Sequence, residues 1–145
     1  MPINGFNVGK DVQININRPD GSQVSFSIVT SFEAREITKG IESKGIDGID
    51  RYGEIPSGWE GSIEIDRGNV NMDALFDYLE GLYYSGQNVP GGTITETITE
   101  ADTGAISQWR FTGVAFKLDE HGSFKGDQKV SQKLSWKASR RIRVQ

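Results

Sequence analysis

The 145-residue sequence contains no cysteine and a single histidine, His121. The absence of cysteine excludes disulfides and thiolate chemistry, and it fits a reducing compartment. Without cysteine or a second histidine, the usual ligands of a zinc site are missing as well. The sequence therefore indicates neither a bound metal nor a cofactor.

Long apolar runs are also missing. The first ten residues, MPINGFNVGK, lack the apolar stretch of a signal peptide, and no segment approaches the roughly 20 apolar residues of a membrane-spanning helix. The formal net charge of −4 argues against a dedicated nucleic-acid-binding protein. We therefore expect a soluble product of the cytoplasm with no membrane segment.

Catalytic motifs are scarce. His121 follows two acidic residues in a predicted turn, where it is either a general base or, more simply, a solvated turn residue, and no nucleophile motif accompanies it. The stretch DGIDRYG at 47–53 begins like a calcium-binding loop but lacks the alternating acids and the distal glutamate. The sequence thus predicts a protein that is not an enzyme.

Glycine, in contrast, is abundant, with 18 residues in the chain, which favours strands joined by turns. Residues 10–18 alternate between apolar and polar side chains, PDGS at 19–22 is typical of a turn, and 23–30 alternate again. This pattern predicts a β-hairpin over 10–30. Further strands are expected at 32–42 and 61–67.

One segment has helical periodicity. Apolar residues recur at helical spacing over 72–85, a range in which Asn71 is expected to cap the start and Gly86 to end the helix. The apolar residues on the predicted face are Met72, Leu75, Phe76, Leu79 and Leu82.

The remaining strands are expected at 93–100, 105–118 and 128–139, and the tail RRIRVQ extends the last of them. The inward side of 105–118 switches near Gly113, which indicates a bulge or a bend. The fold class predicted is mainly β: one domain over 1–145, an antiparallel sandwich or partly closed barrel with one packed helix and a long Gly/Ile-rich loop.

That loop is the segment SKGIDGIDRYGEIPSGWEG at 43–61, which reads as neither a helix nor a regular strand. Loops beyond about 12–15 residues are uncommon unless they are functional or disordered, and this one is too apolar for a disordered tether. Apolar residues that cannot reach a small core are often buried against a partner. The predicted inter-subunit contacts are Ile41, Ile46, Ile49, Tyr52, Ile55 and Trp59.

Charge is segregated along the chain. Residues 39–68 contain four basic and seven acidic side chains, whereas 117–145 contain eight basic and three acidic ones. Two unlike patches suit head-to-tail self-association, but the two segments could equally be neighbours whose ions pair within one subunit. The candidate basic assembly face is Lys129, Lys133, Lys137, Arg141 and Arg143.

The strand TITETITE at 93–100 has an unusual face of threonines. Small, uncharged, hydrated side chains suit the wall of a water-filled bore, although ordinary solvent exposure explains them as well. Acidic groups at such a bore would keep DNA from sticking, whereas lysines would hold it. The candidate lumen residues are Thr93, Thr95, Thr97 and Thr99, with Glu96 and Glu100.

An alternative function of a different class is a carbohydrate- or ligand-binding β module. It would use an exposed aromatic platform, for which the sequence offers Tyr52, Trp59, Trp109 and Trp136.

Taken along its full length, the chain resembles the tail tube proteins of contractile-tailed bacteriophages. The resemblance lies in its size, the early hairpin at 10–30, the Gly/Ile-rich segment at 40–60 and the helix at 72–85. It also includes the ending LDEHGSFKGDQKVSQKLSWKASRRIRVQ, with its alternating lysines and basic tail.

The resemblance implies a structural role without catalysis. Members of that family form hexameric rings whose inner sheets join into a continuous barrel, and the rings stack into a hollow tube inside a contractile sheath. It implies a homo-oligomer in the virion tail, with sheath and baseplate or terminator proteins as partners and DNA passing through the lumen. Related tubes of contractile bacteriocins and type VI secretion are the close alternatives.

Overall fold

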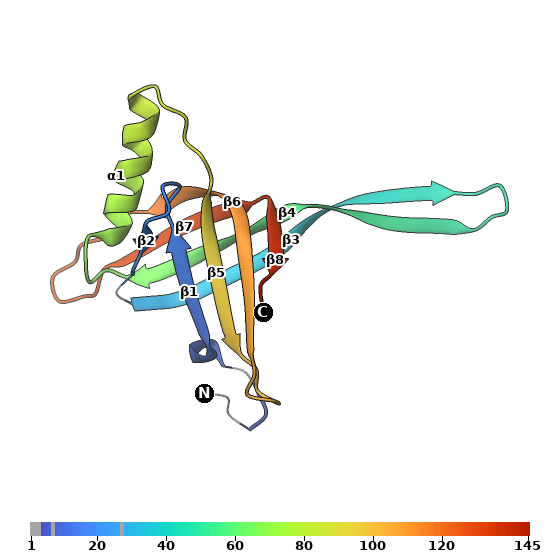
Figure 1. The fold of residues 1–145 in the computed structure, drawn as a ribbon, viewed down its shortest axis with the longest axis horizontal. Coiled ribbons are helices and arrows are strands. Elements are labelled where there is room, and N and C mark those ends of the chain that lie inside the picture. The colour runs from blue at the N-terminus through green and yellow to red at the C-terminus, as the bar shows by residue number, and fades with distance from the viewer. Residues whose placement is uncertain (1–3, 7, 27) are drawn as a thin grey trace.

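The structure, a computed structural model, describes residues 4–6, 8–26 and 28–145. Ser27, which belongs to the strand expected at 23–30, lies outside the described residues. Within the described part, a short 3-10 helix precedes strands and one α-helix (Figure 1). The elements are η1 (Gly9–Asp11), β1 (Val12–Asn17), β2 (Gln23–Val24), β3 (Ile28–Lys44), β4 (Asp50–Asp66), α1 (Asn71–Tyr84), β5 (Gly92–Thr99), β6 (Ile106–Glu120), β7 (Ser131–Ala138) and β8 (Arg140–Arg143).

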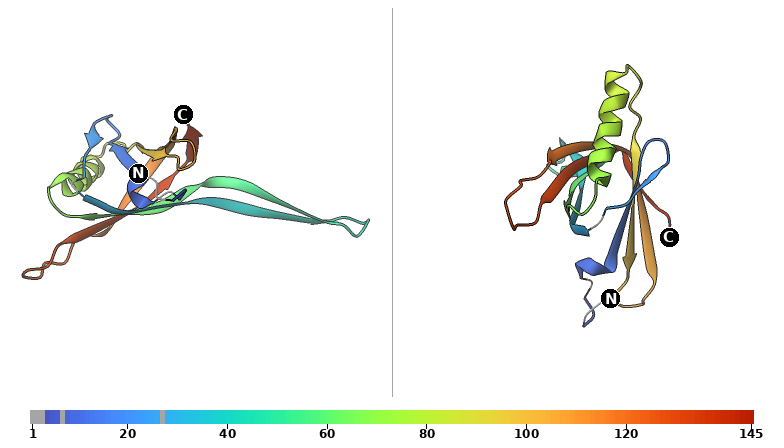
Figure 2. Two further views of the ribbon diagram at one scale, coloured as in Figure 1. Left: turned by 90° about the horizontal axis from the view of Figure 1, so that it is seen from below. Right: turned by 90° about the vertical axis from the view of Figure 1, so that its left-hand side faces the viewer.

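The strands form one antiparallel sheet in the order β2-β1-β5-β6-β7-β4-β3, and β8 also pairs with β6. The sheet does not close into a barrel. It bends along the long strand β6, so that a first layer (β2-β1-β5-β6-β8) packs against a second layer (β6-β7-β4-β3) (Figure 2). The prediction of a mainly β, antiparallel fold is therefore confirmed.

The core lies between these two layers. The ring of Trp136 from β7 lies 4.9 Å from the ring of Phe111 in β6 and stacks at 5.8 Å on Phe32 of β3. These contacts join the layers, because burying large aromatic rings contributes most to a small core. Other buried apolar residues are Ile16, Val24, Ile63, Ile65, Met72, Leu75, Phe76, Ile94, Val114, Leu134 and Ala138.

Helix α1 covers one end of the space between the layers through its buried residues, of which Met72 and Leu75 are fully buried (Figure 1). The predicted cap was wrong: Val70 is the N-cap residue, and Asn71 donates its side-chain amide to the carbonyl of Ser25 instead. The predicted stop is confirmed, because Gly86 has a φ of +78° and its N–H donates to the Tyr83 carbonyl.

The predicted bulge near Gly113 is confirmed. The pairing of β5 with β6 shifts between Gly92, opposite Val114, and Ile94, opposite Phe111, and Gly113 has a φ of +62°. The extra residue lets both Phe111 and Val114 point into the core. The C-terminal tail also behaves as predicted, since β8 continues along β6 in the register of β7.

Two sequence-based assignments near the N-terminus need correction. The second strand of the early hairpin is only β2, paired at Val24 and Gln23, and the chain then crosses to the second layer. The prediction of a long loop at 40–60 is wrong as well. This segment belongs to a β-hairpin of two 17-residue strands, β3 and β4, with a turn at 45–49. Each strand of the ribbon pairs the backbone groups that face the other strand and leaves those on its outer edge to water, so neither strand needs a core-facing pattern.

Gly61 is a position of β4 where a side chain has no room. A Cβ there would lie 1.9 Å from the carbonyl oxygen of Glu33 and 2.8 Å from Cζ2 of Trp136. We expect Gly61→Ala to lower the free energy of unfolding by about 1–3 kcal/mol, because β3 or the tryptophan must move. Gly53→Ala is the matched control, since nothing lies within 4 Å of its Cβ position. Urea denaturation of both variants measures the difference, and equal stability would contradict this packing.

Candidate assembly surfaces

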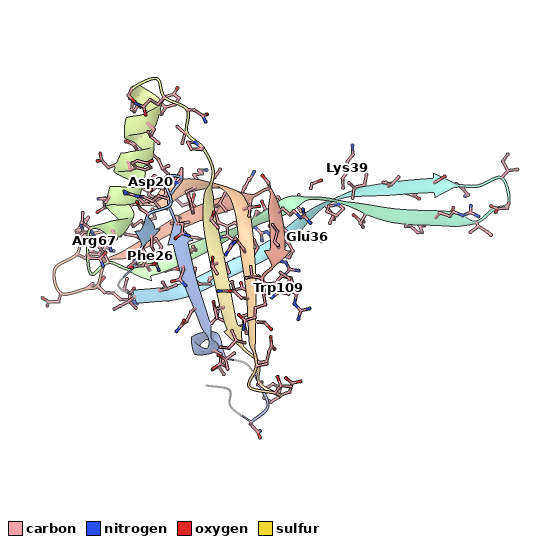
Figure 3. The ribbon with its side chains drawn as sticks, in the orientation of Figure 1. Asp20, Phe26, Glu36, Lys39, Arg67 and Trp109 are labelled. Carbon is pink, nitrogen blue, oxygen red and sulfur yellow. The ribbon has the colours of Figure 1, made fainter. Side chains whose placement is uncertain are left out.

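The hairpin of β3 and β4 extends well beyond the body of the protein (Figures 1 and 2). Strand β7 accompanies β4 only as far as Trp59, opposite Ala138. Beyond that point, residues 37–58 form a two-stranded ribbon, called the arm here, in which the described strands pair only with each other. At about 3.3 Å per residue, the eight residues from Ile37 to Lys44 project about 26 Å. Figure 3 shows Lys39 on this ribbon, beyond the sheet.

Apolar side chains of the arm are exposed. Ile46 is fully exposed at the turn and Tyr52 is 74% exposed, and Ile41, Ile49 and Ile55 are also exposed. Trp59, the sixth residue of the predicted contact set, lies below the arm, partly buried against the ring of Phe111 at 5.7 Å. An isolated two-stranded ribbon is marginally stable in water, so an arm with five exposed apolar residues is well suited to being covered by a partner.

The outer surface of the first layer is polar. Thr95 lies between Asn15 of β1 and Arg110 of β6, and the side chain of Gln108 donates to Thr97 Oγ1 at 3.3 Å. By strand alternation, the four predicted threonines share this surface. We call it the polar face: Gln13, Asn15, Asn17, Thr93, Thr95, Thr97, Thr99, Gln108, Arg110, Thr112 and Arg140. Two exposed isoleucines, Ile106 opposite Thr99 and Ile142 opposite Arg110, share this surface.

The acidic members of the predicted lumen set do not share the polar face. Glu96 points the other way, between the layers, like its neighbour Ile94. Burial raises the pKa of Glu96, and the positive charge of Arg141 offsets this only in part. Glu100 follows the end of β5, in the turn toward β6. The described strands of the polar face therefore present no carboxylate outward, and they present two arginines that sequence reasoning missed.

The predicted basic face is divided between three places. Lys133 and Lys137 are exposed on the outer surface of the second layer, on the side of β7 away from the core. Lys129 lies in the loop before β7, with its ammonium 3.3 Å from Asp66. Arg141 and Arg143 point toward Trp109, on the inner side of β8.

The segregated charges are largely neighbours within one subunit. Lys133 lies opposite Glu64 and Lys137 opposite Glu60 where β4 pairs with β7. The two segments are therefore neighbours within one subunit along these strands, and Lys129 with Asp66 forms an ion pair between them. The turn of the arm is different, because residues 45–50 carry two aspartates and no basic residue.

A groove opens between the layers at the end away from α1. It has a volume of about 750 Å³ and lies between β3, the last strand of the second layer, and residues 12–15 of β1, which β2 does not cover. Its apolar lining includes Val12, Ile14, Val29, Phe32 and Ala34.

Arg141 lies at this groove and is held by two indole rings. Its Cζ is 4.1 Å from the ring centre of Trp59 and 4.0 Å from that of Trp109, a cation–π arrangement. Figure 3 shows Trp109 close to β8. Among the described residues, no carboxylate lies within 4 Å of this guanidinium, so its N–H groups can still donate hydrogen bonds to an acidic partner.

The lone histidine belongs to a polar cluster at the start of α1. Its Nδ1 lies 3.2 Å from Asp73, which also accepts hydrogen bonds from Arg67 and from Gln132. Gln132 in turn donates to the backbone carbonyl of His121. This network ties α1 to the two strands behind it, and the described residues place no nucleophile in it.

The Asp73 carboxylate gives this cluster a testable pH dependence. Partial burial raises the pKa of Asp73, but hydrogen bonds from Arg67 and Gln132 and the nearby charges outweigh it, so the pKa lies below its ordinary value. A lowered folded-state pKa stabilises the fold above the unfolded-state pKa and ceases to do so as pH falls through the folded-state value.

We therefore expect Asp73→Asn to be less stable than the wild type at pH 7, by about 1 kcal/mol or less. The difference should begin to shrink as pH falls below about 4, the ordinary pKa of an aspartate, and should disappear as pH falls through the lower folded-state pKa of Asp73. Urea denaturation at pH 7 and pH 3 measures this, with Asp77→Asn, on an exposed side of the same helix, as the control. If the difference in unfolding free energy between Asp73→Asn and the wild type is the same at both pH values, the loss comes from altered packing or hydrogen bonding and not from the lost charge.

The aromatic platform of the alternative reading is not formed. Trp136 is 1% exposed in the core, and Tyr52 lies on the arm, away from the other three rings. Trp59 and Trp109 are both stacked on Arg141. These side chains therefore do not share one surface on which a sugar could stack.

Comparison with known proteins gives a consistent result for the fold. No family model matches the sequence, and no curated protein is significantly similar to it. A chain of the PVC extracellular contractile injection system, from its sheath-tube complex in the extended state, aligns over 91% of this protein and 88% of its own length, with a TM-score of 0.60 and 14% identity.

Two further structures agree. A chain of the sheath/tube terminator of the same system covers 100% of this protein and 98% of its own length, with a TM-score of 0.59 and 15% identity. A chain from the tail of a gene transfer agent covers 97% and 100%, with a TM-score of 0.56 and 11% identity. The chain thus has the fold found in contractile tube assemblies, and the resemblance to tail tube proteins is confirmed at the level of the fold. In the described part of the chain, no helix has the length and apolar character to span a membrane.

Proposed function

We propose that this protein is the structural subunit of a tail tube, which assembles head to tail into rings that stack as a hollow conduit. The observation that carries this proposal is the arm, which exposes five apolar residues on a ribbon that leaves its own body. Such a ribbon is completed when neighbouring copies cover it. The fold shared with contractile tube assemblies supports the same role, which is structural and requires no catalysis.

The edges of the first layer support ring formation. Strand β8 has β6 on one side and no described strand on the other, and residues 12–15 of β1 are open on the side away from β5. Two open edges at opposite ends of one layer are complementary, because antiparallel or parallel pairing satisfies their free backbone groups. Pairing of β8 with β1 of the next copy would join the polar faces into one inner wall. We propose six copies per ring, as the resemblance implies.

The proposed setting is the tail of a virion or related particle, with a sheath outside the tube and baseplate and terminator proteins at its ends. The proposed cargo is DNA. A tube of a contractile injection system with another cargo is the second candidate, and one observation favours it: the polar face presents Arg110 and Arg140 without a carboxylate. Cations in a bore would hold DNA, with an affinity that falls steeply as salt rises.

Electron microscopy of the purified protein over a range of concentrations tests the proposed function. We expect rings or long tubes with a central channel, and image averages that show six-fold symmetry. A protein that stays monomeric at high concentration, with its arm uncovered, would contradict the proposal.

A further inference from the structure

The groove between β1 and β3 and the turn of the arm have complementary chemistry. The groove is lined by apolar side chains, by the cation Arg141 and by one carboxylate, Glu96. The turn of the arm has apolar side chains, Ile46 and Ile49, that are exposed to water. Each of these surfaces exposes apolar groups to water, and contact between the two surfaces would bury those groups.

The charges match as well. Asp47 forms an ion pair with Arg51 of its own arm at 3.1 Å. Asp50 has no basic group within 4 Å among the described residues. Arg141 has no carboxylate within 4 Å among them, although its charge already offsets part of the rise in the pKa of Glu96, which lines the same groove. A carboxylate brought to this stacked guanidinium would form a charge-assisted hydrogen bond in a partly buried place, where such bonds are strongest.

An arm that fills this groove comes from another copy. The arm points away from its own body, and its turn lies at the far end of β3 and β4 from the sheet (Figure 1). The groove volume, about 750 Å³, is in the range of sites that accept several side chains. A tube supplies every groove with a neighbour's arm at high local concentration.

We propose that the turn of the arm, residues 45–50, seats in the groove between β1 and β3 of a second copy of this chain. Ile46 and Ile49 contact Val29 and Phe32 there, and Asp50 pairs with Arg141. This rests on the proposed function, because it names the receiving surface for the arm in the assembled tube.

The absence of cysteine makes a crosslinking test clean. The double variant Ile46→Cys/Val29→Cys places one thiol at the turn of the arm and one in the groove. Assembled tubes are treated with a short bis-maleimide, since direct disulfides need strict geometry, and separated by denaturing electrophoresis. We expect a ladder of covalent oligomers. The control Ile46→Cys/Ser123→Cys, with its second thiol in the loop between β6 and β7, should give none.

Each outcome has a definite reading. Tubes without a ladder would overturn the seating in this groove and leave the proposed function intact. A wild-type protein without tubes would overturn the proposed function itself. If the double variant does not assemble alone, the single variants Ile46→Cys and Val29→Cys are mixed with a fivefold excess of wild type, and crosslinking is scored as covalent dimers of the two. Absence of those dimers in mixed tubes also overturns the proposal.

Discussion

Replacing residues 41–53 by an Asn-Gly turn is expected to abolish tube formation and leave the body folded. Gly40 and Glu54 are cross-strand partners, so a two-residue turn can join them. The deletion removes Ile41, Ile46, Ile49 and Tyr52. Covering a large apolar side chain contributes about 1.5–3 kcal/mol, so the loss per subunit is several kcal/mol. The concentration needed for assembly should rise at least about 100-fold.

The fold should tolerate this change because no buried core residue lies within the deleted segment. We expect a melting temperature within a few degrees of the wild type and an unchanged near-UV circular dichroism spectrum. Phe124→Ser is the matched control, since Phe124 is exposed at 66% but lies in the loop between β6 and β7, away from the arm. Normal tubes from the shortened protein would contradict the assignment of the arm as an assembly element.

Where one side of an element faces the core, the periodicity of the sequence predicted the structure well. Strand β7 alternates strictly, and its buried residues Leu134 and Trp136 are the ones that the alternation selects. Helix α1 and the bulge at Gly113 follow from the same reasoning, because burial on one face imposes a period on the sequence. The bulge was visible as a change of phase between Phe111 and Val114.

The arm could not be predicted in this way. Neither of its faces packs on a core, so its apolar residues need not alternate, and its glycines lower the local preference for a strand. What makes it a hairpin is pairing along its whole length, from Ile37 opposite Gly58 to Lys44 opposite Asp50. Its length and exposed isoleucines nevertheless singled it out as a contact segment.

The groove depends on contacts between residues that are far apart in the sequence, which periodicity cannot predict. Arg141 stacks on Trp59, a residue 82 positions earlier in the chain, because β4 and β8 come together at the end of the sheet. Likewise, alternation separated the threonines of β5 from Glu96, but only the pairing of Ile94 with Ile16 shows that the glutamate side faces inward.

Assembly is expected to protect the polar face almost completely from large reagents. Thr95→Cys places a unique thiol at the centre of that face, and a biotin maleimide labels it in the free subunit. After assembly, streptavidin should bind the label at the tube ends alone, because a folded protein cannot enter a closed bore lined by this face. Binding per subunit should therefore fall by a factor that grows with tube length, to about a hundredth in long tubes.

Lys133→Cys is the matched control for this experiment, because it changes an exposed residue of similar strand position on the outer surface of the second layer. If the lysine side of β7 lies away from the bore, its biotin should bind streptavidin equally before and after assembly in tubes without a sheath. The reverse result, in which streptavidin reaches the label at position 95 but not the label at position 133, would mean that the lysine side of β7 lines the bore and the polar face lies outside. It would also place lysines along the bore, where they would bind the phosphates of DNA and prevent it from sliding.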